Sequence, residues 1–286
     1  MCGICGVLNK DLVQEVSNDL LKAMTDVIRH RGPDDEGTFL DRNVGLGIRR
    51  LSVIDPEGGM QPQQTEDGRH HIVFNGEIYN YPELRRASEN RGHRFRSKSD
   101  TETVLHLYED RGADCVLPLN GMFAFAVYDA ADRTLMLARD RLGIKPLYYA
   151  DTGRSFVFAS EIKALLVHPD VSREIDPTAL DQFLAYKYIP GPRTIFKGIR
   201  KLPPGHILIW KSGRFDVRSY WKLSFAAGLP KSDEEVAEEL MGRIRNAVRM
   251  QMISDVPLGA FLSGGIDSSL IVALMQEVSS QPVKTF

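Results

Sequence analysis

The chain has 286 residues, 43% of them hydrophobic, so it can bury a sizeable core, and its length suggests two domains. Its net charge of −2 and pI near 6.4 give no support to nucleic-acid or anionic-membrane binding. No apolar run approaches the ~18 residues of a membrane span and no charged leader precedes one, so we expect a cytoplasmic protein that binds neither nucleic acid nor membrane.

Three cysteines, Cys2, Cys5 and Cys115, form no paired framework, which fits a reducing compartment. Cys2 and Cys5 form a CxxC pair, but no second pair or nearby histidine pair completes a zinc site. If residues 3–8 form a strand, positions three apart point to opposite faces. We therefore expect Cys5 in the core and Cys2 at a cleft.

Removal of Met1 would leave Cys2 with a free α-amine, so that the nucleophile and its base share one residue. An α-amine titrates at about 8 and a thiol at about 8.5, so near neutral pH some of the amine is neutral and accepts the thiol proton. On these residues alone, a small-residue strand with buried cysteines is the stronger interpretation. The rest of the chain must supply the catalytic context.

The first half of the chain predicts helices and short strands in alternation. Helical spacing of apolar residues predicts an amphipathic helix over residues 12–30, which ends at residues 31–34. A turn-rich segment spans residues 55–68, and a loop at residues 75–77 leads into an extended stretch over 78–81. Further helices are expected over 82–90 and 101–111, and strands over 37–40, 44–48, 71–74, 123–129, 135–138, 146–150 and 156–159. Many strand positions are apolar on both faces, which predicts two stacked sheets with helices outside.

Residues 176–220 are rich in proline, glycine and aromatic residues and end in a predicted hairpin, 206–210 with 215–220. A linker is expected at 224–231. Ser232 or Asp233 then caps a helix that runs to about residue 253. A strand at 257–262, a helix at 268–278 and a strand from 282 follow. We expect one domain over residues 1–222 and a linker with the start of a second domain over 223–286.

A second candidate site is the run from Ser263 to Ser269, Ser-Gly-Gly-Ile-Asp-Ser-Ser, between a predicted strand and a predicted helix. Glycines allow close approach of an anion, hydroxyls add donors, and the helix N-terminus offers free amides. The run lacks the lysine of a Walker A loop. A tight turn with a helix cap remains the alternative to a pyrophosphate site.

The order of several motifs carries a family resemblance. These motifs are Met1-Cys2-Gly3-Ile4, Arg29-His30-Arg31-Gly32-Pro33-Asp34, Arg50-Leu51-Ser52-Val53-Ile54-Asp55, Asn75-Gly76-Glu77-Ile78-Tyr79-Asn80, Ser99-Asp100-Thr101-Glu102, Gly121-Met122-Phe123-Ala124-Phe125 and Arg139 to Tyr149. They resemble the class II glutamine amidotransferases, and with the 263–269 loop the whole chain resembles the glutamine-hydrolysing asparagine synthetases. This resemblance implies an α+β fold, a four-layer αββα N-terminal-nucleophile hydrolase sandwich, followed by the beginning of an α/β PP-loop ATPase domain.

The resemblance also implies roles for individual residues. Cys2 would attack the glutamine amide and form a thioester, while the Asn75 amide and the Gly76 N–H stabilise the oxyanion. Arg50 would bind the substrate α-carboxylate, and Glu77 and Asp100 its α-ammonium group. The pocket would be completed by the backbone of Leu51, Ser52, Val53 and Ile54, with His30 and Arg31 as support. Taken singly, Arg50 fits a surface ion pair, Asn75-Gly76 a hairpin turn and Asp100 a helix cap.

For the second domain, the resemblance implies that aspartate is activated by ATP as an acyl-adenylate, which ammonia then attacks. Leu262 would lie near the nucleotide, and Asp267 would hold Mg²⁺. The pyrophosphate would be held by Ser263, Gly264, Gly265 and Ser268. A segment of ~55 residues can hardly bury its own core or hold ATP tightly, so we expect the chain to be part of a longer enzyme.

The lead hypothesis is a glutamine-dependent asparagine synthetase that uses glutamine, aspartate and ATP, with a homodimer as an open possibility. The alternatives are a related amidotransferase for another carboxylate, as in cell-surface polysaccharide or antibiotic synthesis, and a noncatalytic glutamine-binding module. The 263–269 loop speaks against amidophosphoribosyl and glucosamine-phosphate amidotransferases. Retention of Met1 would favour the noncatalytic module, because the amine would then be an amide.

Overall fold

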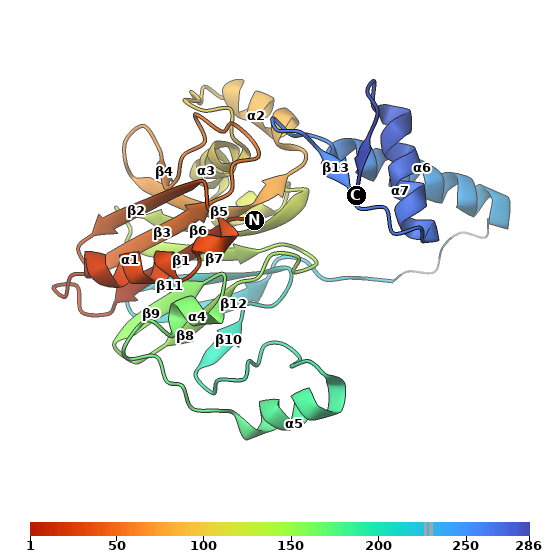
Figure 1. The fold of residues 1–286 in the computed structure, drawn as a ribbon. Helices are drawn as coiled ribbons and strands as arrows, with labels where there is room; N and C mark the ends of the chain where they lie inside the picture. The colour runs from red at the N-terminus through yellow and green to blue at the C-terminus, as the bar shows by residue number, and fades with distance from the viewer. Residues whose placement is uncertain (226–227, 229–230) are drawn as a thin grey trace. The chain divides into compact units, whose positions relative to one another are not determined.

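A computed structural model describes residues 1–225, 228 and 231–286, which form two compact units, Met1–Lys222 and Leu223–Phe286 (Figure 1). The first unit contains two six-stranded sheets whose neighbouring strands are antiparallel. The first sheet consists, in spatial order, of β10 (Ile199–Lys201), β8 (Tyr148–Asp151), β9 (Ser155–Ala159), β1 (Gly3–Asn9), β3 (Val44–Arg50) and β2 (Asp35–Asp41). The second consists of β12 (Arg214–Ser219), β11 (His206–Lys211), β7 (Thr134–Arg139), β6 (Gly121–Asp129), β5 (His70–Ile78) and β4 (Gln63–Gln64).

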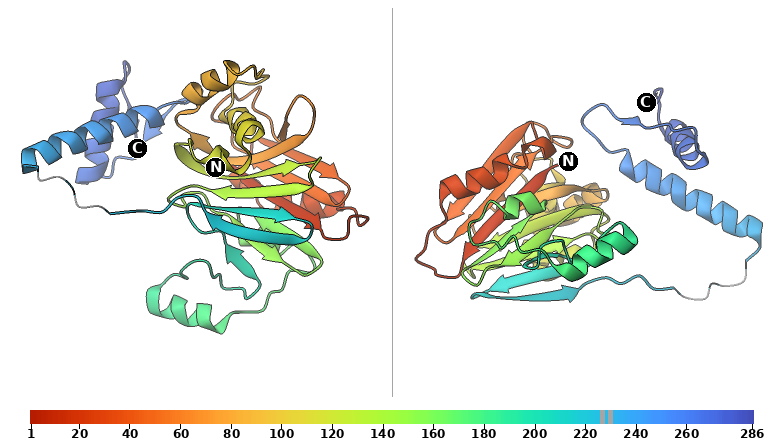
Figure 2. Two further views of the ribbon diagram at one scale, coloured as in Figure 1. Left: turned by 180° about the vertical axis from the view of Figure 1, so that it is seen from behind. Right: turned by 60° about the horizontal axis from the view of Figure 1, so that its bottom comes forward.

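Three apolar clusters separate the layers of this unit. One fills the space between the sheets and includes Ile4 and Leu8 of β1 with Ala124 and Ala126 of β6. A second lies between the first sheet and the helices α1 (Asn18–Asp26) and α4 (Ile162–Leu165). A third lies between the second sheet and α3 (Asp100–Arg111), with α2 (Tyr81–Glu89) packed beside α3 (Figure 2). The predicted αββα sandwich is therefore confirmed.

The first helix is shorter than predicted. The sequence pattern indicated residues 12–30, but α1 begins at Asn18 because the Ser17 hydroxyl accepts a hydrogen bond from Leu20 N at 3.4 Å and caps it there. Leu12 and Val13 are 46% and 87% exposed and take no part in the helix face. The basic stretch that follows α1 forms a separate 3₁₀ turn, η1 (Arg29–Arg31).

The prediction of a loop at residues 75–77 is wrong, because these residues belong to strand β5. Asn75 lies opposite Ala124 and Gly76 opposite Phe123 in the pairing with β6. Asn-Gly is a strong turn signal, but pairing along the whole of β5 overrides it. A Cβ at Gly76 would lie 2.3 Å from the Met122 carbonyl oxygen, so the close approach of the two strands requires glycine there.

Two elements of the region 176–220 were not predicted: strand β10 and helix α5 (Pro177–Tyr186). Asp176 caps α5 by accepting from Thr178 N at 3.0 Å, and Pro177 occupies the first turn. This cap-proline pair is a recognisable helix start, but the composition of the segment masked it. The predicted hairpin is present as β11 and β12.

The second unit contains α6 (Asp233–Gln251), β13 (Gly259–Ala260), α7 (Ile266–Val278) and β14 (Lys284–Thr285). Ser232 and Glu235 form a capping box at the start of α6. The helices share a small cluster of Val248, Leu274 and Met275, and β13 and β14 pair in parallel. The strand predicted at 257–262 is thus only two residues long, and the predicted linker at 224–231 lies partly outside the described residues. Among the helices of the described ranges, none combines the length and apolarity needed to cross a membrane.

Candidate active site

A small pocket lies where β1 begins, β3 ends and α3 begins. Strand alternation explains which side chains reach it. Ile4 and Ile48 belong to the cluster between the sheets, so Cys2 and Arg50, two positions away on β1 and β3, project to the same side. The lining consists of Cys2, Arg50, Leu51, Val53, Ile54, Gly59, Gln61, Phe74, Gly76, Glu77, Ser99, Asp100 and Thr101.

The Cys2 thiol contacts both the backbone N–H and the backbone carbonyl of Leu51. Leu51 N donates to Cys2 Sγ at 3.4 Å, and Sγ donates to Leu51 O at 3.6 Å. Burial raises the pKa of the Cys2 thiol, so near neutral pH it is protonated and needs a base before it becomes nucleophilic. Cys5 points to the opposite face and is fully buried, as the alternation argument predicted.

The chain around Cys2 is held by the basic stretch at η1. Arg31 Nε donates to the Cys2 carbonyl at 2.8 Å, and Arg31 Nη1 reaches Glu161 at 3.1 Å. His30 Nε2 lies 2.9 Å from the same Glu161 carboxylate. Arg31 therefore positions the backbone of Cys2, while His30 supports the carboxylate that orients Arg31.

The side-chain amide of Asn75 has a hydrogen-bond donor, Nδ2, without a partner among the described residues. Val73 belongs to the cluster between the sheets, so Asn75, two residues along β5, projects to the same side as Cys2. The Asn75 side chain is buried, and among the described residues its Nδ2 has no hydrogen-bond partner. A buried N–H left unpaired costs free energy unless a ligand satisfies it, so this amide is suited to receive a substrate oxygen.

The Gly76 N–H points to the pocket edge of β5. Phe74 N donates to Gln61 Oε1 at 2.7 Å and Ile78 N donates to Asp100 Oδ2 at 2.9 Å, and both acceptors belong to pocket residues. Backbone N–H groups alternate along a strand, so Gly76 N, midway between them, faces the same edge. β4 ends its pairing at residue Gln63 opposite Ile72 and leaves this edge open.

Two carboxylates, Glu77 and Asp100, lie at the pocket. Burial, and then the nearby charge of Asp100, raises the pKa of Glu77 to about 8. Burial also raises the pKa of Asp100 to about 6, although hydrogen bonds from Ile78 N and Thr101 N lower it. Two acids destabilised in their charged forms are suited to bind a cationic ligand, which would restore the charge balance.

Arg50 lies in the pocket but already has partners. Its Nη2 donates to Ile54 O at 3.0 Å and to Asp55 O at 2.8 Å, and its Nη1 donates to Pro56 O at 3.0 Å. In this structure the guanidinium holds the loop that borders the pocket. The predicted contact of Arg50 with a substrate carboxylate stays a prediction and requires part of this fork to be released.

The loop after β3 supplies the predicted pocket wall. Leu51, Val53 and Ile54 line the pocket, whereas Ser52 does not. Ser52 N instead donates to Asp34 Oδ2 at 2.9 Å, which ties the loop to the end of the Arg29–Asp34 motif. Asn75 also lies behind the lining surface, with only 1% of its surface exposed.

Sequence reasoning missed several residues around the pocket. Lys145 is 3% exposed, its Nζ lies 3.0 Å from Met1 Sδ, and burial lowers its pKa while nearby Glu77 and Cys2 raise it. The motif that contains Lys145 was recognised, but no local signal assigns a role to one lysine within it. The pocket also includes Gly59, Gln61, Phe74, Ser99 and Thr101, which only the tertiary structure brings to it.

The run 263–268 of the second unit follows β13 and continues into the first turn of α7, which begins at Ile266, two residues earlier than predicted. Gly264 adopts a φ of +79°, which favours glycine, and Gly265 occupies the N-cap of α7 without a side-chain cap. Ser263 Oγ and Ser268 Oγ lie 2.9 Å apart; Ser263 is exposed and Ser268 is partly exposed. Leu262 N bonds to Phe286 O at 2.9 Å, and Asp267 lies in the first turn of α7. Exposed hydroxyls and free amides of this kind fit a pyrophosphate group.

Comparisons with known proteins show the family to which the chain is similar. The chain is 42% identical over 289 residues to asparagine synthetase [glutamine-hydrolyzing] 1 of Bacillus subtilis (strain 168), an alignment that covers 100% of this chain and 45% of the relative. A putative asparagine synthetase 2 of Methanocaldococcus jannaschii is 37% identical, over 97% of this chain and 57% of the relative. Amidase chry2 of Gibberella zeae is 36% identical, over 99% and 44%. The chain thus spans about half the length of these curated relatives.

Among solved structures, the glutamine phosphoribosylpyrophosphate amidotransferase of B. subtilis matches with a TM-score of 0.58 and 17% identity, over 100% of this chain and 65% of that one. At this identity the likeness shows the fold alone. A family model described as asparagine synthase matches residues 239–286, and one described as glutamine amidotransferase domain matches residues 1–221. The chain therefore belongs, through residues 1–221, to the glutamine amidotransferase domain family.

Proposed function

We propose that this chain is the glutaminase part and the beginning of the synthetase part of a glutamine-dependent asparagine synthetase. The observation that carries the glutaminase assignment is the pocket itself. It holds the Cys2 thiol and the edge-facing Gly76 N–H, and the unpartnered Asn75 amide is buried behind its lining. A nucleophile beside two such donors is what acyl transfer requires.

In the proposed reaction, Met1 is removed and the α-amine of Cys2 accepts the thiol proton. Sγ then bonds to the amide carbon of glutamine, and Asn75 and Gly76 donate to the resulting oxyanion. The C–N bond breaks, ammonia leaves with a proton returned by the α-amine, and water hydrolyses the thioester to glutamate. The raised pKa of the Cys2 thiol explains why a base is needed so close to the sulfur.

Substrate recognition in this proposal depends on charge. Glu77 and Asp100 bind the α-ammonium group of glutamine, and Arg50 binds its α-carboxylate once the loop at residues 54–56 gives up part of the guanidinium. The backbone of Leu51, Val53 and Ile54 completes the wall, and Ser52 N holds this loop through Asp34. Met1 Sδ contacts Lys145 Nζ, so removal of Met1 leaves this ammonium group facing the site.

For the synthetase part we propose that Ser263, Gly264, Gly265 and Ser268 hold the pyrophosphate of ATP, with Leu262 near the nucleotide and Asp267 near Mg²⁺. ATP would supply the activation of aspartate as an acyl-adenylate that ammonia attacks. The support is the left-handed Gly264, the uncapped start of α7 and the similarity to curated asparagine synthetases.

N-terminal mass analysis combined with an electrophilic glutamine analogue tests the glutaminase assignment. We expect a chain that begins at Cys2 and gains one analogue per molecule at that residue, and we expect Cys2→Ala to gain none while it keeps its thermal midpoint. Glutamine turnover by Cys2→Ala in a clean preparation would contradict the nucleophile assignment. Retention of Met1 in an active chain would contradict the amine base.

A second candidate is the amidation of another carboxylate, because Amidase chry2 is nearly as similar to this chain as the synthetases are. The acceptor is tested in a polypeptide with a complete synthetase domain, supplied with ATP and glutamine labelled with ¹⁵N in its amide. Labelled asparagine formed from aspartate supports the lead proposal. Labelled amide on a different carboxylate, with none on aspartate, supports the second.

A further inference from the structure

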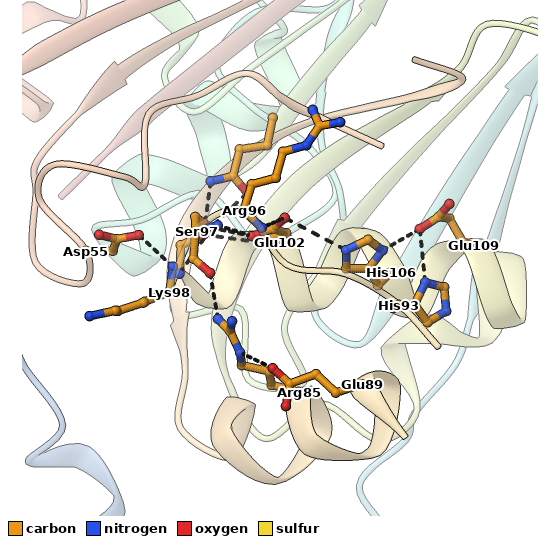
Figure 3. Close-up of polar contacts among 12 residues, drawn as sticks. Asp55, Arg85, Glu89, His93, Arg96, Ser97, Lys98, Glu102, His106 and Glu109 are labelled. Atoms are coloured by element: carbon orange, nitrogen blue, oxygen red, sulfur yellow. Dashed lines mark hydrogen bonds and ion pairs between the residues drawn. The ribbon is translucent and has the colours of Figure 1, made fainter. Parts of the chain in front are cut away.

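A cluster of imidazole and carboxylate groups lies along α3, outside the glutamine pocket (Figure 3). His106 and Glu109 are three residues apart on the helix, and His93 follows α2 in the chain. The amide of His93 donates to Ser88 O at 3.2 Å, which fixes the segment after α2. Ligand atoms of His93, His106 and Glu109 all lie within 4.8 Å of one another.

Each ring nitrogen of His93 faces a carboxylate, Nε2 that of Asp110 and Nδ1 that of Glu109. His93 Nε2 lies 2.7 Å from Asp110 Oδ1, and Arg91 Nε donates to the other Asp110 oxygen at 2.7 Å. In the neutral ring with its proton on Nε2, toward Asp110, Nδ1 carries the lone pair. That lone pair faces Glu109 Oε2 at 3.6 Å, and these two acceptors are satisfied together by a metal ion between them or by a second proton on the ring.

The ring nitrogens of His106 also lie near two carboxylates, those of Glu109 and Glu102. Its Nδ1 lies 2.5 Å from the same Glu109 oxygen, while its side chain is only 2% exposed. The buried Nε2 of His106 has no hydrogen-bond partner among the described residues and lies 3.9 Å from Glu102 Oε1. With the proton on Nδ1, Nε2 presents a lone pair toward a carboxylate. With the proton on Nε2, Nδ1 presents its lone pair to Glu109 Oε2 instead.

We propose that His93 Nδ1, His106 Nδ1 and Glu109 bind one divalent transition-metal ion of the zinc class. The ion replaces the proton between His106 and Glu109, and the ring proton of His106 then resides on Nε2, toward Glu102. Metal-bound histidines commonly donate their other N–H to a carboxylate. Asp110 would fill this role for His93, and Glu102 for His106.

The metal class follows from the ligand set and its spacing. Two imidazoles and one carboxylate suit zinc-like ions, whereas Mg²⁺ and Ca²⁺ prefer oxygen ligands. Metal–ligand distances of about 2.0–2.2 Å in a tetrahedron place the ligand atoms about 3.3 Å apart. The 3.6 Å separation needs little change, the 2.5 Å separation must widen by less than about 1 Å, and the ligand atoms of the two histidines, which lie within 4.8 Å of each other, must close to the same spacing. The side chains of His93 and Glu109 are 18% and 21% exposed, which leaves a water-accessible fourth position.

The site has a structural consequence for the glutamine pocket. The same helix that carries His106 and Glu109 presents Asp100 and Thr101 to the pocket at its first turn. A bound ion would link the segment after α2 to α3 and so stabilise the helix that positions these residues. Metal binding is therefore expected to raise the thermal midpoint of the chain.

The test uses an untagged, chelator-treated chain titrated with Zn²⁺ and Co²⁺. Because Cys2 can also bind these ions, the reference carries Cys2→Ser, and His93→Gln, Glu109→Gln and Asp110→Asn are added to it singly. His206→Gln is the matched control, since His206 lies outside the cluster and bonds to Pro204 O. Bound metal is counted by elemental analysis after desalting, and the thermal midpoint is measured with and without Zn²⁺.

We expect one equivalent of Zn²⁺ in the reference and in the control, none in His93→Gln or Glu109→Gln, and about 10- to 100-fold weaker binding in Asp110→Asn. X-ray absorption at the zinc edge must show nitrogen and oxygen ligands at about 2.0–2.2 Å without sulfur at about 2.3 Å. This measurement does not depend on any ligand variant folding. A reference that retains no metal, or variants that retain as much as it does, would overturn the proposal and indicate a cluster that holds only protons.

Discussion

At the scale of single residues, three side chains at the pocket supply three different chemical groups. Cys2 supplies the thiol, Asn75 an unpartnered amide, and Glu77 a carboxylate destabilised by burial. Each lies where strand alternation turns it toward the space between the sheets. The adjacent residue Phe74 belongs to the apolar cluster between the second sheet and α3, and it borders the pocket from there.

Asn75→Ala is expected to lower the kcat of glutamine hydrolysis by about 10²–10³-fold, because one oxyanion donor is lost. KM should change little, since the interaction develops mainly in the transition state. The native Nδ2 has no partner, so removal of this N–H breaks no hydrogen bond, but truncation of a buried side chain leaves a cavity and should lower the thermal midpoint modestly. Steady-state kinetics together with a melting curve check both expectations, and an unchanged kcat would exclude Asn75 from the oxyanion site.

Glutamine binding is expected to depend on pH through Glu77 and Asp100. Their pKa values are raised to about 8 and about 6, so as the pH falls from 8 to 6 these groups gain protons and lose the charge that binds an ammonium group. The KM for glutamine should therefore rise as the pH falls through this window. In Glu77→Gln the KM should be higher and its dependence on pH between 7 and 8 weaker. A wild-type KM that is flat from pH 6 to 8 would contradict this assignment.

At the scale of elements, β5 is the strand on which the site depends. Its register with β6 places Asn75 and Gly76 beside Ala124 and Phe123, and its open edge exposes the Gly76 N–H. A slip of one residue would turn Asn75 and Glu77 toward the outer core and Phe74 toward the space between the sheets. The strand pairing therefore sets the chemistry as much as the residue types do.

Gly76→Ala is expected to lower both the thermal midpoint and the glutaminase activity, because the added Cβ would lie 2.3 Å from the Met122 carbonyl oxygen and would push β5 from β6. Gly198→Ala is the matched control, since a Cβ at Gly198 meets nothing within 4 Å. Melting curves and glutamine turnover of both variants provide the comparison. Equal behaviour of the two variants would show that the close strand approach at Gly76 is not needed.

At the scale of the whole molecule, the chain forms two units with separate apolar clusters. Three clusters lie within Met1–Lys222, and the cluster around Val248, Leu274 and Met275 lies within Leu223–Phe286. Each of the catalytic and glutamine-binding residues proposed above belongs to the first unit.

A chain shortened to residues 1–222 is therefore expected to unfold in one cooperative transition and to keep a glutaminase kcat/KM within about threefold of the value for residues 1–286, a difference of less than about 1 kcal/mol. Calorimetry and glutaminase assays of the two chains, both processed at Met1, make the comparison. Aggregation of the shorter chain, or loss of most of its activity, would show that residues 223–286 contribute to the first unit.

The family, the orientation of the first strand and several helix ends could be predicted from local sequence patterns. The order of motifs predicted the family, and alternation along residues 3–8 separated the roles of Cys2 and Cys5, since strand periodicity is a property of the chain itself. The cap and first-turn acids of α6 were also readable, because such signals act within a few residues. The glutamine-binding and ATP-loop roles, the cytoplasmic location and the homodimer stay predictions.

Contacts between distant segments decided the rest. Pairing of β5 with β6 overrode the turn signal of Asn75-Gly76, and three carbonyl groups of a folded loop engaged Arg50. Lys145 reached Met1 across 144 positions, and the segment after α2 brought His93 to α3. None of these contacts leaves a local pattern, because each depends on packing free energy gained only when the sheets and helices come together. The residue types and their order therefore determined which chemical groups are available. The pairing and packing of the strands determined where those groups lie.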